Sequence, residues 1–328
     1  MSAATAIFLV LFAAFLWGSW LQARKYTGDF PLPSFMIWLY FASLVLVWGV
    51  ILVNELVNPV HIFTAIRSSP GLAAVVCLCG ASMAIGMQLQ MSVIDKVGLI
   101  LSNSVSATCG VLLGTLLTVM LGGLPENVSV GMIFFSAFVL IIATLVCQFS
   151  GKLRDKDLSK ASSRPAKTQD SKAALLLVLS SLLVAAYPLG MSLGVKTKFS
   201  DGGFPPLVCV GLLAFGSFAG TMIYSAFFLS KNKQWKTLFS KKYKKAILIS
   251  SFCGLCHYGG NLIHVISSHA LSVAVSWLIG RTANMWTYLW GIYHKEYQGA
   301  KSRTYAVLVC GIAIYVIGIL LLSRSFYR

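Results

Sequence analysis

The sequence predicts an all-α integral membrane protein in which ten transmembrane helices form two inverted five-helix repeats. Two observations predict the membrane class: only 11% of the 328 residues are charged, and the apolar residues gather in long stretches. A third observation, a partial match of the chain to itself, predicts the repeat. Soluble proteins carry about a quarter charged residues, so we expect lipid rather than water to surround most of this chain.

Apolar stretches long enough to cross a bilayer recur along the whole chain. A spanning helix needs about 20 predominantly apolar residues. Glycine and proline break the stretches at joints such as 28–31, 122–125 and 202–206. The predicted spans are 4–22, 34–53, 71–93, 98–121, 128–148, 173–194, 205–229, 246–267, 271–293 and 303–323.

Lysine and arginine are distributed unequally between the two ends of the predicted spans. The loops that follow spans one, three, five, seven and nine hold twenty of them, against five on the other side, termini included. Cytoplasmic loops carry such an excess, so we expect both termini outside and the loops 149–172 and 230–245 in the cytoplasm. These loops account for the net charge of +17, and no nucleic-acid partner is expected. The default location is the plasma membrane, as a multi-pass protein.

Sliding the chain by 174 residues brings similar positions together. Phe30 then falls on Phe204, and Gly80 on Gly254. Five spans per half is an odd number, so the second half would enter the membrane from the opposite side, as in alternating-access transporters. The expected domains are a first five-helix repeat (1–148), a cytoplasmic linker (149–172) and a second five-helix repeat (173–328).

Polar residues inside the apolar stretches gather in predicted spans three, four, eight and nine. Arg281 is the only Lys, Arg, Asp or Glu deep in a predicted span, and such groups usually face a cavity and serve a function. The alternative is that Arg281 donates to backbone carbonyls of a neighbouring helix. Asn284 lies one helical turn further on, so the two share a face.

The eighth predicted span carries three polar residues on one face, at i, i+4 and i+7. Spans three and four contribute amides and serines, among them Gln90 and Ser106. No Asp or Glu lies deep in a span. If a proton is transported, we therefore expect His257 or His264 to carry it, because histidine titrates near neutral pH. The residues expected to bind a solute are Arg281, Asn284, His257, Asn261, His264, Gln88, Asn103, Trp17 and Trp277.

Residues 253–257 spell Cys-Gly-Leu-Cys-His, the attachment pattern of c-type haem. Haem attachment needs an accessible outward-facing loop, whereas this stretch lies within a predicted spanning helix. We therefore expect no cofactor and no metal. No pairing of a nucleophile with a base is present, so the chain is not expected to be an enzyme.

Short motifs carry a resemblance to a known family. The end of span one, Leu16-Trp17-Gly18-Ser19-Trp20, resembles the Trp-Gly-Ser ending of the glucose/ribose and rhamnose branch of the drug/metabolite transporter superfamily. Residues 254–267 with Trp277, and the Lys-Glu turn within 291–296, are similar to the eighth and ninth helices of that branch. The resemblance implies a secondary transporter with a central cavity that takes up a monosaccharide, with or without a proton.

Three functions remain open at this point. The first is a permease for a monosaccharide or polyol. The second is an exchanger or permease for an anionic metabolite, an organic acid or a nucleotide-sugar, with Arg281 as its bidentate partner. The third, from another class, is a membrane enzyme or a sensor that transports nothing. The partners expected are a small solute and the lipid bilayer, and the chain is either a monomer or a homodimer.

Overall fold

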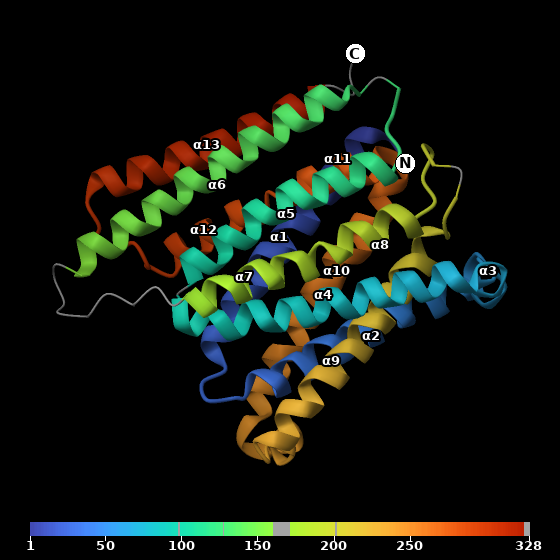
Figure 1. Cartoon of the computed structure of the whole chain (residues 1–328), viewed down its shortest axis with the longest axis horizontal. Coiled ribbons are helices and arrows are strands. Elements are labelled where there is room, and N and C mark those ends of the chain that lie inside the picture. The colour runs from blue at the N-terminus through green and yellow to red at the C-terminus, as the bar shows by residue number, and fades with distance from the viewer. Residues whose placement is uncertain (98, 127, 160–170, 201, 325–328) are drawn as a thin grey trace.

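The computed structural model is a bundle of helices joined by turns (Figure 1). It describes residues 1–324 except 98, 127, 160–170 and 201, and the side chains of 94–105, 159 and 171–174 also lie outside the description. Within the described residues, the one strand-like contact is an isolated bridge between Val195 and Phe204. The elements are α1 (Ala3–Trp20), η1 (Leu21–Tyr26), α2 (Leu32–Val57), α3 (Ile62–Ser68), α4 (Pro70–Val97), α5 (Leu99–Leu121), α6 (Val130–Ser159), α7 (Ser171–Val184), α8 (Ala186–Gly194), α9 (Pro206–Lys231), η2 (Trp235–Phe239), η3 (Lys241–Tyr243), α10 (Lys244–Leu271), α11 (Val273–Gly280), α12 (Ala283–Tyr293) and α13 (Ser302–Arg324).

Two similar turns lead into α2 and α9. Gly28 and Gly203 have positive φ angles of 56° and 102°, which glycine adopts without steric cost. Pro31 and Pro205 then stand immediately before the two helices. Pro33 and Pro206 follow in the first turn of the helices, where proline is favoured because its φ is already helical and it has no N–H to leave unpaired.

Eight helical segments in the described part of the chain are long and apolar enough to cross a membrane. They correspond to predicted spans one to three, five to eight and ten. The described side chains of span four begin only at Ser106, and the helix Ser106–Leu121 is too short to be counted as a membrane span. Span nine is interrupted between α11 and α12. The structure is therefore that of an all-helical, multi-pass membrane protein, and the count of ten spans stays a prediction. α6 continues to Ser159, inside the predicted linker.

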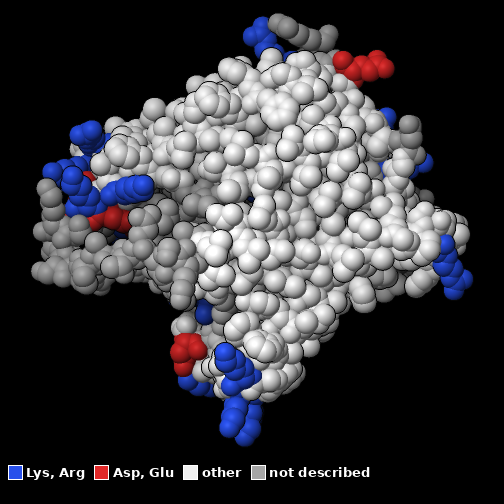
Figure 2. Space-filling view, in the orientation of Figure 1, with Lys and Arg blue, Asp and Glu red and all other residues white. Residues whose placement is uncertain are grey.

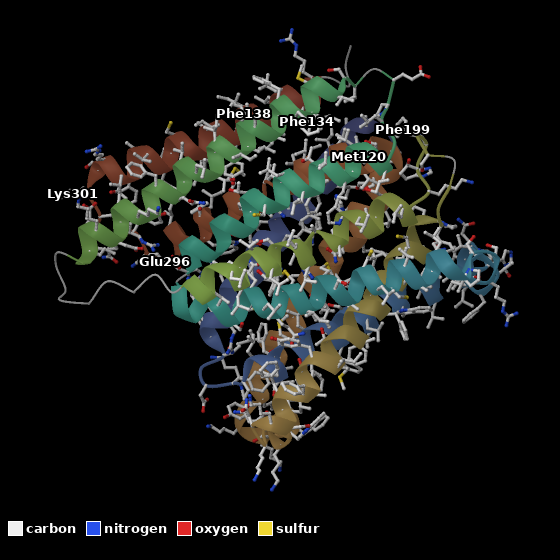
Figure 3. The ribbon with its side chains drawn as sticks, viewed as in Figure 1. Met120, Phe134, Phe138, Phe199, Glu296 and Lys301 are labelled. Atoms are coloured by element: carbon white, nitrogen blue, oxygen red, sulfur yellow. The ribbon has the colours of Figure 1, made fainter. Side chains whose placement is uncertain are left out.

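The outer surface is apolar between two polar ends. Figure 2 shows Lys and Arg gathered at the ends of the helices, with an uncharged surface between them. Phe134 and Phe138 on α6 and Met120 on α5 are exposed apolar side chains of that surface (Figure 3), which suits contact with lipid. The start of α1 and the end of α13 lie near one end of the bundle (Figure 1), and Glu296 and Lys301 lie at the other (Figure 3).

The helices pack in pairs that relate the two halves of the chain. α2 and α9 begin and end 174 residues apart, and so do α4 and α10. α4 packs along α9 as α10 packs along α2, and α1 packs along α10 as α7 and α8 pack along α4. α6 lies beside α13 at the edge of the bundle (Figure 1). If each residue is replaced by the one 174 positions away, the pair α4–α9 becomes α10–α2, and the pair α1–α10 becomes α7/α8–α4. The pair α6–α13 becomes itself.

A pair of hydrogen bonds follows the same relation. Ser43 Oγ in α2 donates to the backbone carbonyl of Gly254 in α10, at 3.0 Å. Ser217 Oγ in α9 donates to the carbonyl of Gly80 in α4, at 2.9 Å. Each residue of the first bond is 174 positions from its counterpart in the second. Small residues at these crossings let the helix backbones approach closely.

The ion pairs of the described residues lie at the end of the bundle that carries the basic loops. Glu296, after α12, accepts from Lys25 of η1 and from Arg154 Nη1 of α6, the latter at 3.2 Å. Lys242 donates to Asp29 at 2.6 Å and holds the pKa of that carboxyl below its usual range. Exposed ion pairs contribute little to the free energy of folding. These pairs connect neighbouring loops at this end of the bundle.

Candidate functional site

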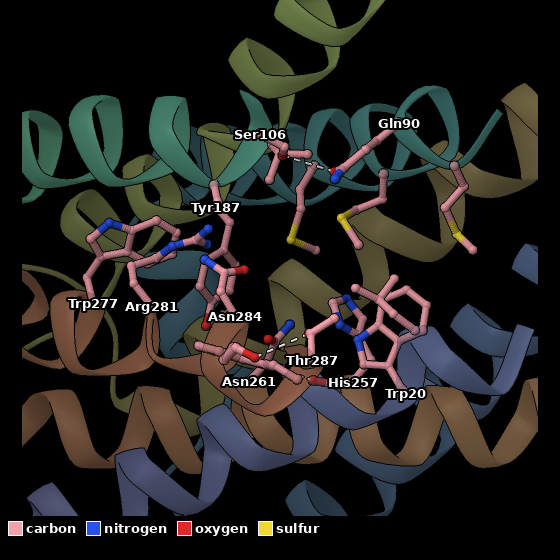
Figure 4. A pocket seen from close by; sticks show the side chains of 18 residues that line it. Trp20, Gln90, Ser106, Tyr187, His257, Asn261, Trp277, Arg281, Asn284 and Thr287 are labelled. Carbon is pink, nitrogen blue, oxygen red and sulfur yellow. Dashed lines mark hydrogen bonds between the residues drawn. The ribbon is translucent and has the colours of Figure 1, made fainter. Parts of the chain in front are cut away.

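A cavity of about 130 Å³ lies between α1, α4, α5, α10 and the two interrupted segments α7–α8 and α11–α12 (Figure 4). Pockets for drug-sized ligands measure roughly 300–1,000 Å³, so this cavity suits a smaller solute. Its lining residues are Trp17, Trp20, Leu21, Met83, Met87, Gln90, Met91, Ser106, Ala107, Val184, Tyr187, His257, Asn261, Trp277, Arg281, Ala283, Asn284 and Thr287.

Arg281 stands at the point where the predicted ninth span is interrupted. α11 ends at Gly280 and α12 begins at Ala283, so the backbone around Arg281 belongs to neither helix. Its guanidinium carbon lies 5.2 Å from the centre of the Trp277 ring, a cation–π distance. A Cβ on Gly110 of α5 would lie 3.3 Å from its Nη2. Glycine at that position therefore leaves room for the guanidinium.

Arg281 is a cation without an acidic partner in the described part of the chain. It takes part in none of the ion pairs described there, and its Nε has no hydrogen-bond partner. No Asp or Glu is among the lining residues whose side chains the structure describes. An unpaired charge away from water is costly, so this cavity favours a negatively charged occupant over a positive one.

Amide and imidazole groups on α10 and α12 add polar atoms to the cavity wall. His257 and Asn261 are 7% and 2% exposed, and Asn284 is 8% exposed. Among the described residues, both ring nitrogens of His257 lack a hydrogen-bond partner, and the amide nitrogens of Asn261 and Asn284 make no bond of good geometry, although each lies beside a tyrosine hydroxyl. Buried polar groups left unpaired cost free energy. A solute that accepts hydrogen bonds would satisfy them.

One wall of the cavity is a stripe of methionines on α4. Met83, Met87 and Met91 follow one another at intervals of four, which places them on one helix face. Trp20 and Leu21, at the end of α1, line the cavity as well. Methionine side chains adapt their shape to a partner, so this wall can follow an apolar surface of variable outline.

Aromatic side chains close the cavity on the side where α8 and α10 end and α11 begins. The Tyr187 hydroxyl lies 3.0 Å from Nδ1 of His264. The Trp17 ring lies 5.1 Å from the His264 ring, and the Tyr187 ring lies 6.1 Å from the Trp277 ring. Trp17 Nε1 also donates to the backbone carbonyl of His257, at 3.1 Å. We call Trp17, Tyr187, His264 and Trp277 the aromatic cluster.

The cavity brings together most of the residues that the sequence singled out. His264 does not line it but is bonded to Tyr187, which does. Gln88 is turned toward α9, where its Oε1 accepts from Ser225 at 2.6 Å. The side chain of Asn103 lies outside the described residues. The predicted residues that line the cavity are Arg281, Asn284, His257, Asn261, Trp17 and Trp277.

Tyr187 and the three methionines were not predicted. The methionines recur at every fourth position of span three, which is a signal of one helix face. An apolar face in a membrane helix has the same composition whether it meets lipid, another helix or a cavity, so the pattern alone does not distinguish these surroundings. Tyr187 stands beside Pro188, a residue that often interrupts a helix.

We expect Trp17→Ala to lower the free energy of unfolding by about 3–5 kcal/mol, the usual cost of such a truncation in a core. The Trp17 ring fits between Gly260 and Gly280, where added Cβ atoms would lie 2.5 and 2.7 Å from it. Trp17→Phe keeps most of the ring and loses the bond to His257, so about 1 kcal/mol is expected. Thermal unfolding of the purified protein measures both.

Trp235→Ala serves as the control for this prediction, because Trp235 is 42% exposed on η2. We expect it to change the free energy of unfolding by less than about 1 kcal/mol. Equal losses in the Trp17→Ala and Trp235→Ala proteins would contradict a packing role for the aromatic cluster.

No protein-family model matches the chain, and a search of curated proteins finds no match. The function is therefore argued from the geometry of the cavity and the helices around it.

Proposed function

We propose that the protein is a secondary transporter that moves a small polar solute across a membrane by alternating access, with the central cavity as its binding site. The observation that carries the proposal is the position of the cavity. It lies at the interruption of a membrane helix, between helices of both halves of the chain, and its wall there holds the unpaired Arg281. Interrupted helices that meet at a central site are typical of such transporters.

The proposal includes an inverted repeat of two five-helix halves. It is supported by the shared offset of 174 residues between the bounds of α2 and α9 and between those of α4 and α10. The two serine–glycine hydrogen bonds, with equal offsets, support it further. Two halves of similar packing can exchange roles when the cavity changes the side to which it opens, and this exchange is the physical basis of alternating access.

In this proposal the structure represents a state whose cavity is closed on the side of the termini and extends toward the basic loops. The aromatic cluster closes the first direction. In the second direction the lining continues to Trp20, Leu21 and Met91, near the ends of α1 and α4. With the basic loops in the cytoplasm, as their charge predicts, this is an inward-facing state.

Two classes of solute fit the proposal. A monosaccharide is the class that the resemblance to sugar transporters implies, and indole rings and amides are suited to a sugar ring. An anionic metabolite is the second candidate, and a specific observation favours it. In the described part of the chain, Arg281 has no acidic partner, and no Asp or Glu lines the cavity that it faces.

Reconstitution into proteoliposomes tests the transport function. Purified protein is expected to accelerate the entry of labelled glucose or of labelled gluconate, an anion of similar size, relative to empty liposomes. Uptake of glucose alone would favour the first solute class, and uptake of gluconate alone the second. A protein whose melting temperature rises with a solute, but which transports none, would be a sensor or an enzyme and would contradict the proposal.

A further inference from the structure

The electrostatics of the cavity distinguish an anion from a neutral solute. Among the described residues that line the cavity, Arg281 is the one that carries a formal charge. A neutral sugar would leave this cation without a counter-charge. A carboxylate would pair with the planar guanidinium through two parallel N–H···O bonds, the strongest polar contact that a protein side chain commonly makes. The charge of the cavity therefore favours a solute that carries a carboxylate.

The unpaired polar atoms near Arg281 are mostly donors. Figure 4 shows Arg281, Asn284 and Asn261 on the same side of the cavity. By distance and angle the amide nitrogens of Asn284 and Asn261 make no hydrogen bond in the described residues, although both side chains are more than nine-tenths buried and lie beside the hydroxyls of Tyr315 and Tyr258. An ionised carboxylate only accepts hydrogen bonds, whereas each sugar hydroxyl also donates one. A cavity wall that offers hydrogen-bond donors and no described carboxylate suits the acid group of a solute better than it suits the hydroxyl groups of a sugar.

The remaining wall is largely apolar, and its two polar residues on α4 and α5, Gln90 and Ser106, hydrogen-bond to each other at 3.1 Å. The methionines of α4, at positions 83, 87 and 91, line the cavity together with Trp20 and Leu21. Against such a wall a hydroxyl loses its hydrogen bonds to water and gains none. An apolar group gains free energy in proportion to the area that it buries. We therefore expect the part of the solute that faces the methionines of α4 to be apolar.

We propose that the cavity binds a small organic acid, with its carboxylate at Arg281 and Asn284 and its apolar body along the methionines of α4. This proposal rests on the transport function proposed above and narrows its solute to amphipathic monocarboxylates. Asn284 is a specificity-determining residue in it, because it stands one helical turn from Arg281 and offers its amide nitrogen to the same group.

The first experiment compares the melting temperature of the purified full-length protein in sodium acetate and sodium butyrate at constant ionic strength. Sodium chloride, sodium phosphate and glucose are the reference compounds. A ligand that binds the folded state raises the melting temperature by mass action. Each buried methylene is expected to tighten binding about fourfold. Butyrate, with two more methylenes than acetate, is therefore expected to bind roughly 15-fold more tightly.

The second experiment uses Asn284→Asp, which places a carboxylate beside Arg281 without changing the size of the side chain. This internal carboxylate competes with the solute, so we expect the apparent affinity for butyrate to fall at least tenfold. The same change gives Arg281 a partner, so the melting temperature without ligand is expected to rise. Asn232→Asp adds the same charge at the exposed end of α9 and is expected to leave both quantities unchanged.

Several outcomes would overturn the organic-acid proposal. One is a melting temperature that rises with glucose or inorganic phosphate and not with butyrate. Another is a butyrate response that persists in Asn284→Asp, and the absence of any butyrate response is a third. If the protein transports glucose but its melting temperature does not respond to butyrate, the transport function stands and the organic-acid proposal fails. Butyrate binding by a protein that carries none of glucose, gluconate and labelled butyrate into liposomes faster than they enter empty liposomes would contradict the transport function and leave the binding proposal standing.

Discussion

Gly254→Ala is expected to lower the free energy of unfolding by roughly 3 kcal/mol or more, at the upper end of what overpacking costs. A Cβ at this position would collide with the backbone carbonyl of Leu39 in α2. A backbone group cannot rotate out of the way as a side chain can, so α2 and α10 would have to separate. The bond from Ser43 to the Gly254 carbonyl would be strained as well. Thermal unfolding and the yield of monodisperse protein measure the effect.

Two further glycine substitutions make this prediction specific. Gly49→Ala is the matched control, because no atom lies within 4 Å of the added Cβ. It is expected to be neutral or stabilising by up to about 1 kcal/mol, since alanine favours helix. Gly80→Ala would meet the carbonyl of Leu213 in α9 and is expected to cost as much as Gly254→Ala. A tolerated Gly80→Ala would contradict the equivalence of the two halves.

Arg281→Gln is expected to weaken butyrate binding at least 100-fold while leaving the folded protein as stable as the wild type or more stable. Hydrogen bonds to charged groups contribute about 1.5–3 kcal/mol each, and the loss of two removes about 3 kcal/mol or more, over 100-fold in affinity. Removal of an unpaired cation also relieves the cost of burying it. Calorimetric titration with butyrate and thermal unfolding measure the two quantities, which should move in opposite directions.

Arg67→Gln provides the control, because it removes the same charge from the exposed face of α3 and is expected to change neither quantity. Arg281→Lys keeps the charge but loses the planar fork of donors, so an affinity loss of about tenfold is expected. If Arg281→Gln unfolded readily and the folded remainder still bound butyrate, Arg281 would be a structural donor to neighbouring carbonyls rather than a solute ligand.

Apolar stretches and their joints located the helical segments of this chain from sequence, but not the interruptions inside them. Predicted spans six and nine are each divided in two. A signal existed for span six, because the ring nitrogen of Pro188 cannot donate to the carbonyl of Val184, where α7 ends. In span nine no proline is present, and the interruption at Arg281 depends on contacts with other helices.

The candidate site was predictable in its polar groups and in two of its indole rings, Trp17 and Trp277, but not in its methionines. A charged or amide group in a lipid-facing chain is rare enough to mark a cavity, and Arg281, Asn284 and His257 all line one. Gln88 was singled out on the same grounds, yet Ser225 satisfies it between two helices. Only the identity of the neighbouring helix distinguishes these cases, and a single sequence does not contain it.

The interruption at Arg281 also bears on how this segment enters a bilayer. α11 has 8 residues and α12 has 11, each too short to cross by itself. A central arginine adds roughly 2.5–3.5 kcal/mol to the free energy of insertion. All residues of α11 are buried, and it packs against α1, α5 and α10. α11 is thus surrounded by the rest of the protein rather than by lipid, and we expect it to reach its final position only after those three helices have assembled.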